Sequence, residues 1–416
     1  MLEAYIKVPE FRERLCSGAA GQYIDGFARH LYELGYNCSA WCGRKFLYAA
    51  SHLTTWAQGE GIAANGLSEV VLEQFELHLR HCRCPRPKGG TSRKVIIGCQ
   101  LFLSYLRQIG VVADAFSERK GATCPPLVES FHYWMQQHRG VSDKTLDLYG
   151  HYIAEMLHVC GEDPSRYDAQ GLRAFVLERS RHCSRGTAKL VVTALRMFLR
   201  YLIAEGKCKA GLEHALPTLA HWRLSSLPRY LSSSDVERVI AACDDKTDVG
   251  ARDRAIVLLL ARLALRAGDV AALRLQDIDW QDASLCVSGK GRRQVRLPLS
   301  QEVGDAILNY LKHRPRLNTD KVFVRVQPPL KPFESAHSLT GIVKRALRRA
   351  DVEAPCYGSH VLRHSAATTM LRQGVGLQDI QVVLRHRSIQ TTERYAKVDL
   401  ALLKQVVQPW PEVSSC

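Results

Sequence analysis

Apolar residues recur at helical spacing along the first part of the chain. Tyr23, Phe27 and Leu31 fall on one stripe, and residues 46–56 carry a second stripe of Phe, Leu and Trp. Because residues three or four positions apart share a face of a helix, these stripes predict amphipathic helices from about residue 22 to residue 112. Glycines such as Gly35 interrupt the pattern between helices. The first part of the chain is therefore predicted to be a helical domain.

The end of this helical part recurs further along the chain. The segment GTSRKVIIGCQLFLSYLRQIG, residues 90–110, is followed 96 positions later by GTAKLVVTALRMFLRYLIAEG, residues 186–206, with the Gly-Thr start, the Phe-Leu and Tyr-Leu pairs and the final glycine preserved. We interpret the recurrence as two tandem helical domains, residues 1–113 and 122–210, each of a size that can hold its own core. Convergent packing of unrelated helices is the alternative.

The pattern changes after the second copy. Pro217 and Pro228 mark a linker, and Ser232 can cap a new helix with Asp235 in the reciprocal position. Beyond the cap the sequence predicts a buried helix at 252–263, a hairpin of 285–287 with 295–297, a helix at 301–312, a short strand at 322–324, and helices at 339–350, around 360 and at 377–384. The predicted fold is mainly α with a small β component, in which two tandem helical domains precede an α+β domain over residues 228–416.

The charge balance narrows the class of partner. The 416 residues contain 57 Lys and Arg against 41 Asp and Glu, which gives a net charge of +16. This excess favours a polyanion, most simply nucleic acid, because neutralised phosphates release their counterions. We expect no membrane partner, since the most apolar run, Ile256–Leu265, is interrupted by Arg262 and is too short to span a bilayer. The first residues hold no apolar signal segment, so a cytoplasmic protein is expected.

Fourteen cysteines in such a chain are best interpreted as reduced thiols. The first helical part contains two pairs of cysteines, Cys38 with Cys42 and Cys82 with Cys84, and His78 and His81 lie near the second pair. Their spacing fits no standard zinc finger, so small residues in helix packing are the preferred interpretation and a metal site is the weaker alternative. We expect no cofactor and no metal.

The densest group of chemically active side chains lies near the C-terminal end of the chain. His360, Arg363 and His364 fall within little more than one helical turn, and His386 and Tyr395 follow. The group collects hydrogen-bond donors for an anion beside a phenol. No Glu follows His360, which argues against zinc bound by the two histidines of the helix.

Together with two upstream residues, this group resembles the tyrosine recombinase (phage integrase) family. The resemblance covers residues 231–398 and rests on four motifs in family order: ALRAGDVAALRLQDIDW around Arg266, SGKGRRQVRLPL around Lys290, HVLRHSAAT, and LRHRSIQTTERYAKV. It implies that residues 228–416 form the catalytic domain, that residues 122–210 form the SAM-like core-binding domain, and that residues 1–113 are a further copy of the latter.

The resemblance implies a role for each catalytic residue. Arg266 and Arg363 would hold the non-bridging oxygens of a phosphodiester, whose geometry planar guanidinium groups match with paired hydrogen bonds. Tyr395 would be the nucleophile and form a 3′-phosphotyrosyl link, with no need for ATP or a metal. Lys290 would protonate the departing 5′ oxygen.

Other residues would assist this chemistry. His360 and His386 would donate to the same oxygens or help to take the phenol proton. Asp269 would orient Arg266, and His364 would support the site. Basic residues of the second helical copy could line the DNA backbone, although a solvated helix face is the alternative for each of them. These residues are Lys144, Arg185, Lys189, Arg196 and Arg200.

The implied protein is a site-specific recombinase, the integrase of a mobile element, acting on double-stranded DNA through a Holliday junction and located on the bacterial nucleoid when bound. The apolar tail beyond Tyr395, with Leu400 and Val407, would dock on a neighbouring protomer in a homotetramer. Packing of the tail on its own domain is the alternative. Accessory proteins are a further class of partner. One departure is Arg385, where the family usually has glycine, which leaves the backbone geometry of that loop open. Alternative functions are a type IB topoisomerase, a catalytically silent DNA-binding regulator and, more remotely, a zinc-dependent hydrolase.

Overall fold

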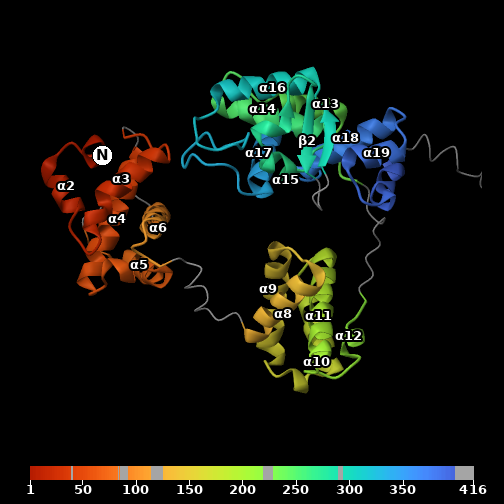
Figure 1. Ribbon diagram of the computed structural model, residues 1–416, viewed down its shortest axis with the longest axis horizontal. Helices are drawn as coiled ribbons and strands as arrows, with labels where there is room; N and C mark the ends of the chain where they lie inside the picture. The colour runs from red at the N-terminus through yellow and green to blue at the C-terminus, as the bar shows by residue number, and fades with distance from the viewer. Residues whose placement is uncertain are drawn as a thin grey trace, which may run out of the picture. The chain divides into compact units, whose positions relative to one another are not determined.

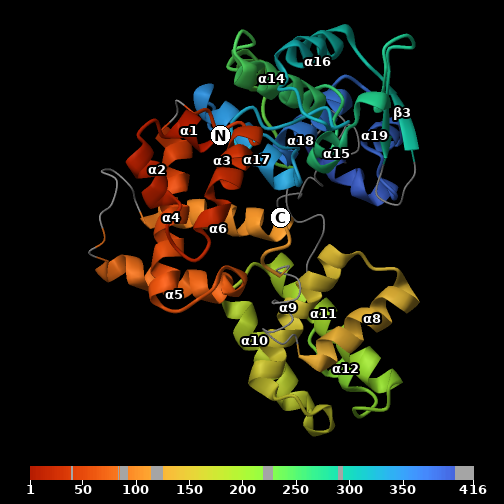
Figure 2. The ribbon, with the colours of Figure 1, turned by 60° about the vertical axis from the view of Figure 1, so that its left-hand side comes forward.

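The computed structural model describes residues 1–38, 41–82, 84, 92–113, 125–218, 228–288 and 294–398. It confirms the predicted class, mainly helical with a small β component (Figures 1 and 2). By its contacts the chain divides into two compact units. One unit comprises Met1–Ala63, Phe75–Tyr105 and Ser226–Cys416, and the other comprises Ala64–Gln74 and Leu106–Ser225. The three domains proposed from the sequence, with boundaries at 1–113, 122–210 and 228–416, remain a prediction.

The N-terminal part is built of helices, as the apolar stripes predict. Its elements are α1 (Leu2–Tyr5), α2 (Pro9–Leu15), η1 (Gly21–Tyr23), α3 (Ile24–Glu33), α4 (Trp41–Gly59), η2 (Ala64–Gly66), α5 (Glu69–His81) and α6 (Ser92–Gln108). Phe27 and Leu31 of the predicted stripe are fully buried. The ring of Phe27 meets the ring of Phe102 edge to face, with centroids 5.0 Å apart, so the stripe on α3 packs against α6.

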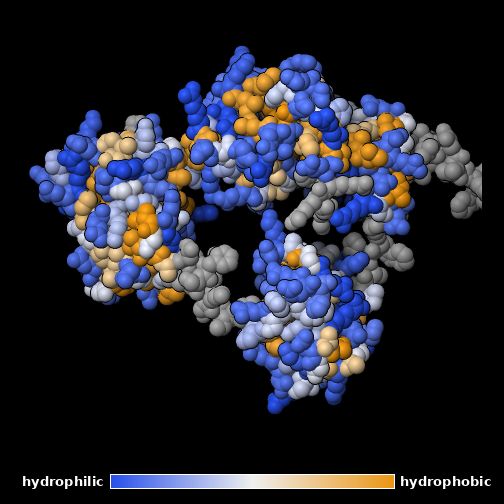
Figure 3. All heavy atoms as spheres, viewed as in Figure 1, coloured by the Kyte–Doolittle hydropathy of each residue, from blue (hydrophilic) through white to orange (hydrophobic). Residues whose placement is uncertain are grey.

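A second helical bundle follows. Its elements are α8 (Pro126–Arg139), α9 (Asp143–Cys160), η3 (Pro164–Arg166), α10 (Ala169–Arg181), α11 (Arg185–Ala204) and α12 (Leu212–Ala215). The long helix α11 packs against α8, α9, α10 and α12 (Figure 1). Phe198, Leu199 and Leu202 are fully buried on α11 because neighbouring helices cover several of its faces. On the face shown in Figure 3, mostly hydrophilic residues cover this bundle.

The elements of the two helical parts correspond in order. α3, α4, α5 and α6 match α8, α9, α10 and α11, and the short turns η2 and η3 occupy the same place in each series. α5 and α10 are both 13 residues long and start 100 positions apart, at Glu69 and Ala169. α6 and α11 both lead into a glycine at positive φ, Gly110 at 73° and Gly206 at 67°, a conformation that glycine adopts without strain. The shared order supports duplication over convergent packing.

The C-terminal part combines helices with a small sheet. Its elements are α13 (Ser233–Ala241), α14 (Asp248–Ala261), α15 (Ala267–Ala272), η4 (Leu275–Asp277), β1 (Ile278–Asp279), β2 (Ser284–Ser288), β3 (Gln294–Pro298), α16 (Gln301–His313), α17 (Ala336–Arg349), α18 (His360–Arg372), α19 (Leu377–Leu384), η5 (Ile389–Thr391) and η6 (Glu393–Val398). The predicted cap of α13 is formed, because Ser232 Oγ accepts from the backbone N–H of Asp235. The Asp235 carboxylate accepts from the Ser232 hydroxyl instead of the backbone N–H.

The helix α14 lies at the centre of the C-terminal core. Ile256, Leu259 and Leu260 are fully buried, since α13, α16, α17 and α18 all pack against this helix. A helix that is apolar on every side is stable only when it is covered in this way. The chain leaves α14 through a short turn that ends at Arg266, the N-cap of α15. The buried helix α14 therefore holds the backbone of Arg266 in position.

The sheet has the order β1-β2-β3 with antiparallel neighbours, and Leu285 lies opposite Leu297. The predicted hairpin is therefore confirmed. The predicted strand at residues 322–324 is not formed: the described residues there make only isolated bridges, Arg274 with Lys321 and Val324 with Pro332. The apolar run is nevertheless fully buried, so its hydrophobicity reports burial and not strand pairing. Among the described residues, no helix is long and apolar enough to cross a membrane.

Candidate active site

Arg363 is a deeply buried cation of the predicted catalytic set. It lies on the first turn of α18, next to Val361 and Leu362, which anchor the helix in the core, and it is 4% exposed. Its guanidinium group donates to the backbone carbonyls of Ala264 and Leu384. Burial and the nearby charge of Arg266 lower the pKa of Arg363 to about 10, so the group stays charged at neutral pH.

Arg266 lies immediately before α15 and points to the same place. Its Nη2 donates to the carbonyl oxygen of Arg385 at 2.9 Å and lies 3.4 Å from that of Leu384. Burial lowers the pKa of Arg266. The two arginines, which are far apart in sequence, therefore converge on the C-terminal end of α19, where backbone carbonyls occupy some of their donors.

Arg385 adds a third guanidinium group to this region. Its Nη2 donates to Asp269 Oδ2 at 2.6 Å, whereas Arg266 lies 4.0 Å from the same oxygen. Asp269 therefore binds Arg385 more closely than the residue it was predicted to orient. The backbone of Arg385 has φ 51° and ψ 46°, the left-handed conformation that a glycine would adopt at this helix end. The loop geometry left open by the sequence is thus the glycine-like one.

His360 and His386 flank Arg363 and Arg385 in sequence. His360 begins α18 and reaches solvent, and desolvation together with the charges of Arg363 and Arg266 lowers its pKa. His386 follows the end of α19, and its Nδ1 lies 2.9 Å from Thr392 Oγ1. Burial and the charge of Arg363 lower the pKa of His386 to about 4, so its imidazole is neutral at neutral pH.

Tyr395 lies on η6 and is 1% exposed. Its hydroxyl lies 2.7 Å from Nδ1 of His364 on α18. Burial and the neighbouring His360 lower the pKa of His364 to about 4, and a neutral ring can accept the hydroxyl proton in this bond. Burial raises the pKa of Tyr395, and the charges of Arg363 and Arg394 oppose this rise. The phenol is therefore neutral and hydrogen-bonded to a neutral imidazole.

Two parts of the predicted site lie outside the described residues. These are Lys290 and the tail with Leu400 and Val407. Sequence reasoning also overlooked two residues near the predicted set. Thr392 contacts His386, and Arg394 places a further positive charge near Tyr395. The Thr-Thr pair and the arginine within LRHRSIQTTERYAKV are the only sequence signal for them.

The candidate DNA-binding residues belong to the second helical bundle. Lys144 on α9 and Arg185, Lys189 and Arg200 on α11 are exposed. Arg196 differs from them, because its guanidinium group donates to the backbone carbonyls of Glu213 and Leu216 and so ties α11 to α12.

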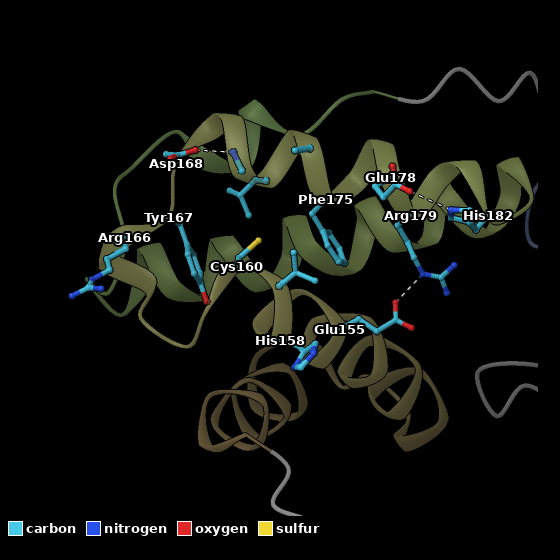
Figure 4. Close-up of a pocket in the computed structure, with 14 residues that line it drawn as sticks. Glu155, His158, Cys160, Arg166, Tyr167, Asp168, Phe175, Glu178, Arg179 and His182 are labelled. Carbon is cyan, nitrogen blue, oxygen red and sulfur yellow. Dashed lines mark hydrogen bonds and ion pairs between the residues drawn. The ribbon is translucent and has the colours of Figure 1, made fainter.

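This bundle also contains a pocket of about 720 Å³ between the end of α9, η3 and α10. Figure 4 shows Phe175 and Cys160 inside it and the ion pair of Arg179 with Glu155 at its edge. None of the predicted catalytic residues lines this pocket. The described residues with catalytic roles implied by the sequence therefore lie outside this pocket.

Comparison with known proteins supports the family resemblance found in the sequence. Residues 229–401 match the model of the Phage integrase family. The chain is 35% identical over 401 residues to the Sinorhizobium fredii protein y4rA, which is named provisionally as an integrase/recombinase, and 95% of each chain is covered. It is 31% identical over 430 residues to y4rF of the same organism, named in the same way, with 99% of this chain and 96% of the relative covered.

Solved structures of recombinases share the fold. The XerH site-specific recombinase bound to palindromic difH substrate, a post-cleavage complex, matches with a TM-score of 0.57 and 18% identity over 73% of this chain and 92% of that one. A lambda integrase tetramer bound to a Holliday junction matches with a TM-score of 0.53 and 16% identity, over 75% of this chain and 88% of that one.

Proposed function

The chain belongs to the phage integrase family of tyrosine recombinases, and on this premise we propose that it is a site-specific DNA recombinase that cuts and rejoins DNA through a 3′-phosphotyrosyl intermediate. Site-specific recombination is the activity of the family as a whole. The finer proposal is that Tyr395 is the nucleophile, that Arg266 and Arg363 bind the scissile phosphate, and that the protein serves a mobile element.

The observation that carries this proposal is the convergence of two guanidinium groups beside a phenol that is bonded to a neutral imidazole. Arg266 and Arg363 both donate to the carbonyl of Leu384, and Tyr395 bonds to His364. A phosphodiester that gathers charge on its non-bridging oxygens during substitution would replace the carbonyls as the acceptor. Charge-assisted bonds to an anion are stronger than bonds to a neutral carbonyl, which favours this exchange.

The proposed step conserves atoms and protons. The oxygen of Tyr395 forms a bond to phosphorus while the bond from phosphorus to the 5′ oxygen breaks. The phenol proton passes to a neutral imidazole, and His364 Nδ1 is the nitrogen in contact with the hydroxyl. Lys290 supplies a proton to the departing 5′ oxygen. The reverse reaction with the 5′ hydroxyl of a partner strand rejoins the DNA, so the step consumes no ATP.

The proposed partners follow from the relatives. The fold neighbours include a recombinase bound to its DNA substrate and a tetramer bound to a Holliday junction. We extend both features to this chain: it would bind double-stranded DNA, consistent with its net charge of +16, and would act as a tetramer held by the tail beyond Tyr395.

The proposal is tested with a nicked suicide duplex that carries the junction sequence of the element encoding the chain. The wild-type protein should form a covalent adduct that survives denaturing electrophoresis, and Tyr395→Phe should bind the duplex without forming it. Tyr357→Phe is the matched control, because Tyr357 is an exposed tyrosine of the same unit, and this variant should keep the adduct.

Three results would overturn parts of this proposal. Adduct formation by Tyr395→Phe would show that the nucleophile is another residue. Binding without any adduct in the wild-type protein would favour a silent DNA-binding regulator. Relaxation of supercoiled plasmids that lack the junction sequence would favour a type IB topoisomerase.

A further inference from the structure

Two histidines and two cysteines meet in the N-terminal part, far from the proposed catalytic residues in sequence. His52 lies on α4, His78 lies on α5, and Cys82 and Cys84 follow the end of α5. One nitrogen or sulfur atom from each side chain lies within 4.8 Å of the corresponding atom of every other. Within the described residues, no other group of three or more His, Cys, Asp or Glu side chains converges so closely.

Two of the separations between donor atoms are close to the edge length of a tetrahedral zinc site. The Nε2 atom of His52 lies 3.5 Å from Cys82 Sγ, and the Nε2 atom of His78 lies 3.8 Å from Cys84 Sγ. With Zn–N bonds of about 2.0–2.1 Å and Zn–S bonds of about 2.3 Å, a tetrahedron has N···S edges of about 3.6 Å. These two N···S separations therefore suit a tetrahedral metal ion, and all four donor atoms lie within 4.8 Å of one another.

The surroundings hold these ligands in place. The Phe75 ring is fully buried and lies 5.0 Å from the ring of His52 and 5.7 Å from that of His78, measured between centroids. The backbone N–H of Cys84 donates to Cys82 Sγ at 3.2 Å, a bond that favours the thiolate form which metals bind. Packing and backbone thus orient the donors toward one point.

The second helical copy shows that the repeat does not require this cluster. One hundred positions after His52, His78, Cys82 and Cys84 it carries Tyr152, Glu178, His182 and Ser184. There Glu178 pairs with His182 at 3.2 Å, and Arg179 pairs with Glu155 at 2.8 Å (Figure 4). Two of the four corresponding positions of the second copy, Glu178 and His182, thus form an ion pair with each other. The donor set is therefore a property of the first copy and not a consequence of the helical architecture.

We propose that His52, His78, Cys82 and Cys84 bind one Zn²⁺ ion in a structural site that ties the end of α5 to α4. Two imidazoles and two thiolates are a donor set that zinc prefers, and four protein ligands leave no open position for catalysis. The site is independent of the recombination chemistry proposed for Tyr395. It argues against the absence of metal expected from the sequence, which considered Cys38 and Cys42 but lacked the ligand His52.

The first test measures the zinc content of the full-length protein after purification without chelators. The wild-type chain should carry about one zinc ion. Cys84→Ser and His78→Gln should reduce the content to background. The matched controls are Cys16→Ser and His81→Gln, which change an exposed cysteine and an exposed histidine of the same unit that lie outside the cluster, and both should keep the ion.

The second test does not depend on how well the variants fold. Co²⁺ added to the metal-free wild-type chain should give thiolate-to-cobalt charge transfer and the visible absorption of a tetrahedral site, and Zn²⁺ should abolish both. A wild-type chain that contains no zinc and gives neither band contradicts the proposal.

The first test can also contradict the proposal. It does so if Cys84→Ser or His78→Gln keeps the full zinc content and shows the far-UV circular dichroism of the wild type.

Discussion

The bond between His364 and Tyr395 joins two residues whose charge states are set by burial. Burial lowers the pKa of His364 to about 4 and raises the pKa of Tyr395, so both are neutral at neutral pH. Under the proposed mechanism, a neutral ring in contact with the hydroxyl is what allows a phenol with an ordinary pKa of about 10 to lose its proton during attack.

The depressed pKa values predict that the free energy of unfolding depends on pH. In the unfolded chain a histidine has a pKa of about 6.5, so between about pH 6.5 and pH 4 the unfolded state binds more protons than the folded state. Stability should therefore fall as the pH falls through this window, by up to about 1.4 kcal/mol per pH unit for each such histidine.

His364→Gln should make this dependence shallower, because one of the depressed histidines is gone. Denaturant unfolding at a series of pH values measures it, with His337→Gln as the control, since His337 is an exposed histidine of the same unit. An unchanged pH profile in His364→Gln would contradict the assigned state of the ring.

At the scale of single residues, the sequence could predict the types and the order of the site residues but not their contacts. Arg266, Arg363 and Tyr395 were identified from motifs, whereas the pairing of Asp269 with Arg385 depends on where the end of α19 lies against α15. Those positions are 116 residues apart in sequence. Only the packing of the helices brings them within hydrogen-bonding distance.

At the scale of elements, the end of α19 organises the site. Its last carbonyls accept from Arg266 and Arg363, and Arg385 closes the helix in the left-handed conformation. The bounds of α19 agree with the sequence prediction of 377–384, because an apolar stripe and the following polar residues define them. Nothing in the sequence indicated that Arg385, the residue that follows α19, forms a salt bridge with Asp269.

Replacing Arg385 by glycine tests what this residue contributes. Glycine relieves about 1–2 kcal/mol of left-handed strain, whereas removing one partner of a buried ion pair costs about 3–5 kcal/mol, so the variant should be less stable by roughly 1–4 kcal/mol. Adding Asp269→Asn should recover part of the loss, because it removes the carboxylate that Arg385→Gly leaves with the more distant Arg266 as its partner. Urea unfolding measures both effects, and Arg387→Ala, at an exposed arginine two positions on, should change the midpoint less. A more stable Arg385→Gly would show that strain outweighs the ion pair.

At the scale of the whole molecule, the two helical parts share one order of helices but differ in the side chains that this order brings together. The sequence predicted the repeat from identical residues, and the matching order of α3–α6 and α8–α11 supports that interpretation. It could not predict the cluster of His52 with Cys82, because His52 comes from another helix and the spacing of the remaining donors fits no known finger. Three-dimensional packing, not spacing, reveals the fourth ligand.

The net charge of +16 predicts salt-dependent DNA binding. Lys189→Ala and Arg200→Ala remove exposed cations of α11, and each should weaken binding for all sequences and reduce the slope of log K against log salt by about 1. Arg196→Ala should instead lower stability, because its guanidinium group holds α12. Fluorescence anisotropy with a labelled duplex over a range of salt concentrations measures the slopes. An unchanged slope in both of the first two variants would exclude this face of α11 from the DNA interface.

The central claim is tested most directly by identifying the residue that becomes attached to DNA. The wild-type protein is incubated with the suicide duplex, the adduct is digested with protease and nuclease, and the modified peptide is sequenced by mass spectrometry. The predicted result is a nucleotide joined through its 3′ phosphate to Tyr395. Attachment at any other residue, or through a 5′ phosphate, would contradict the account.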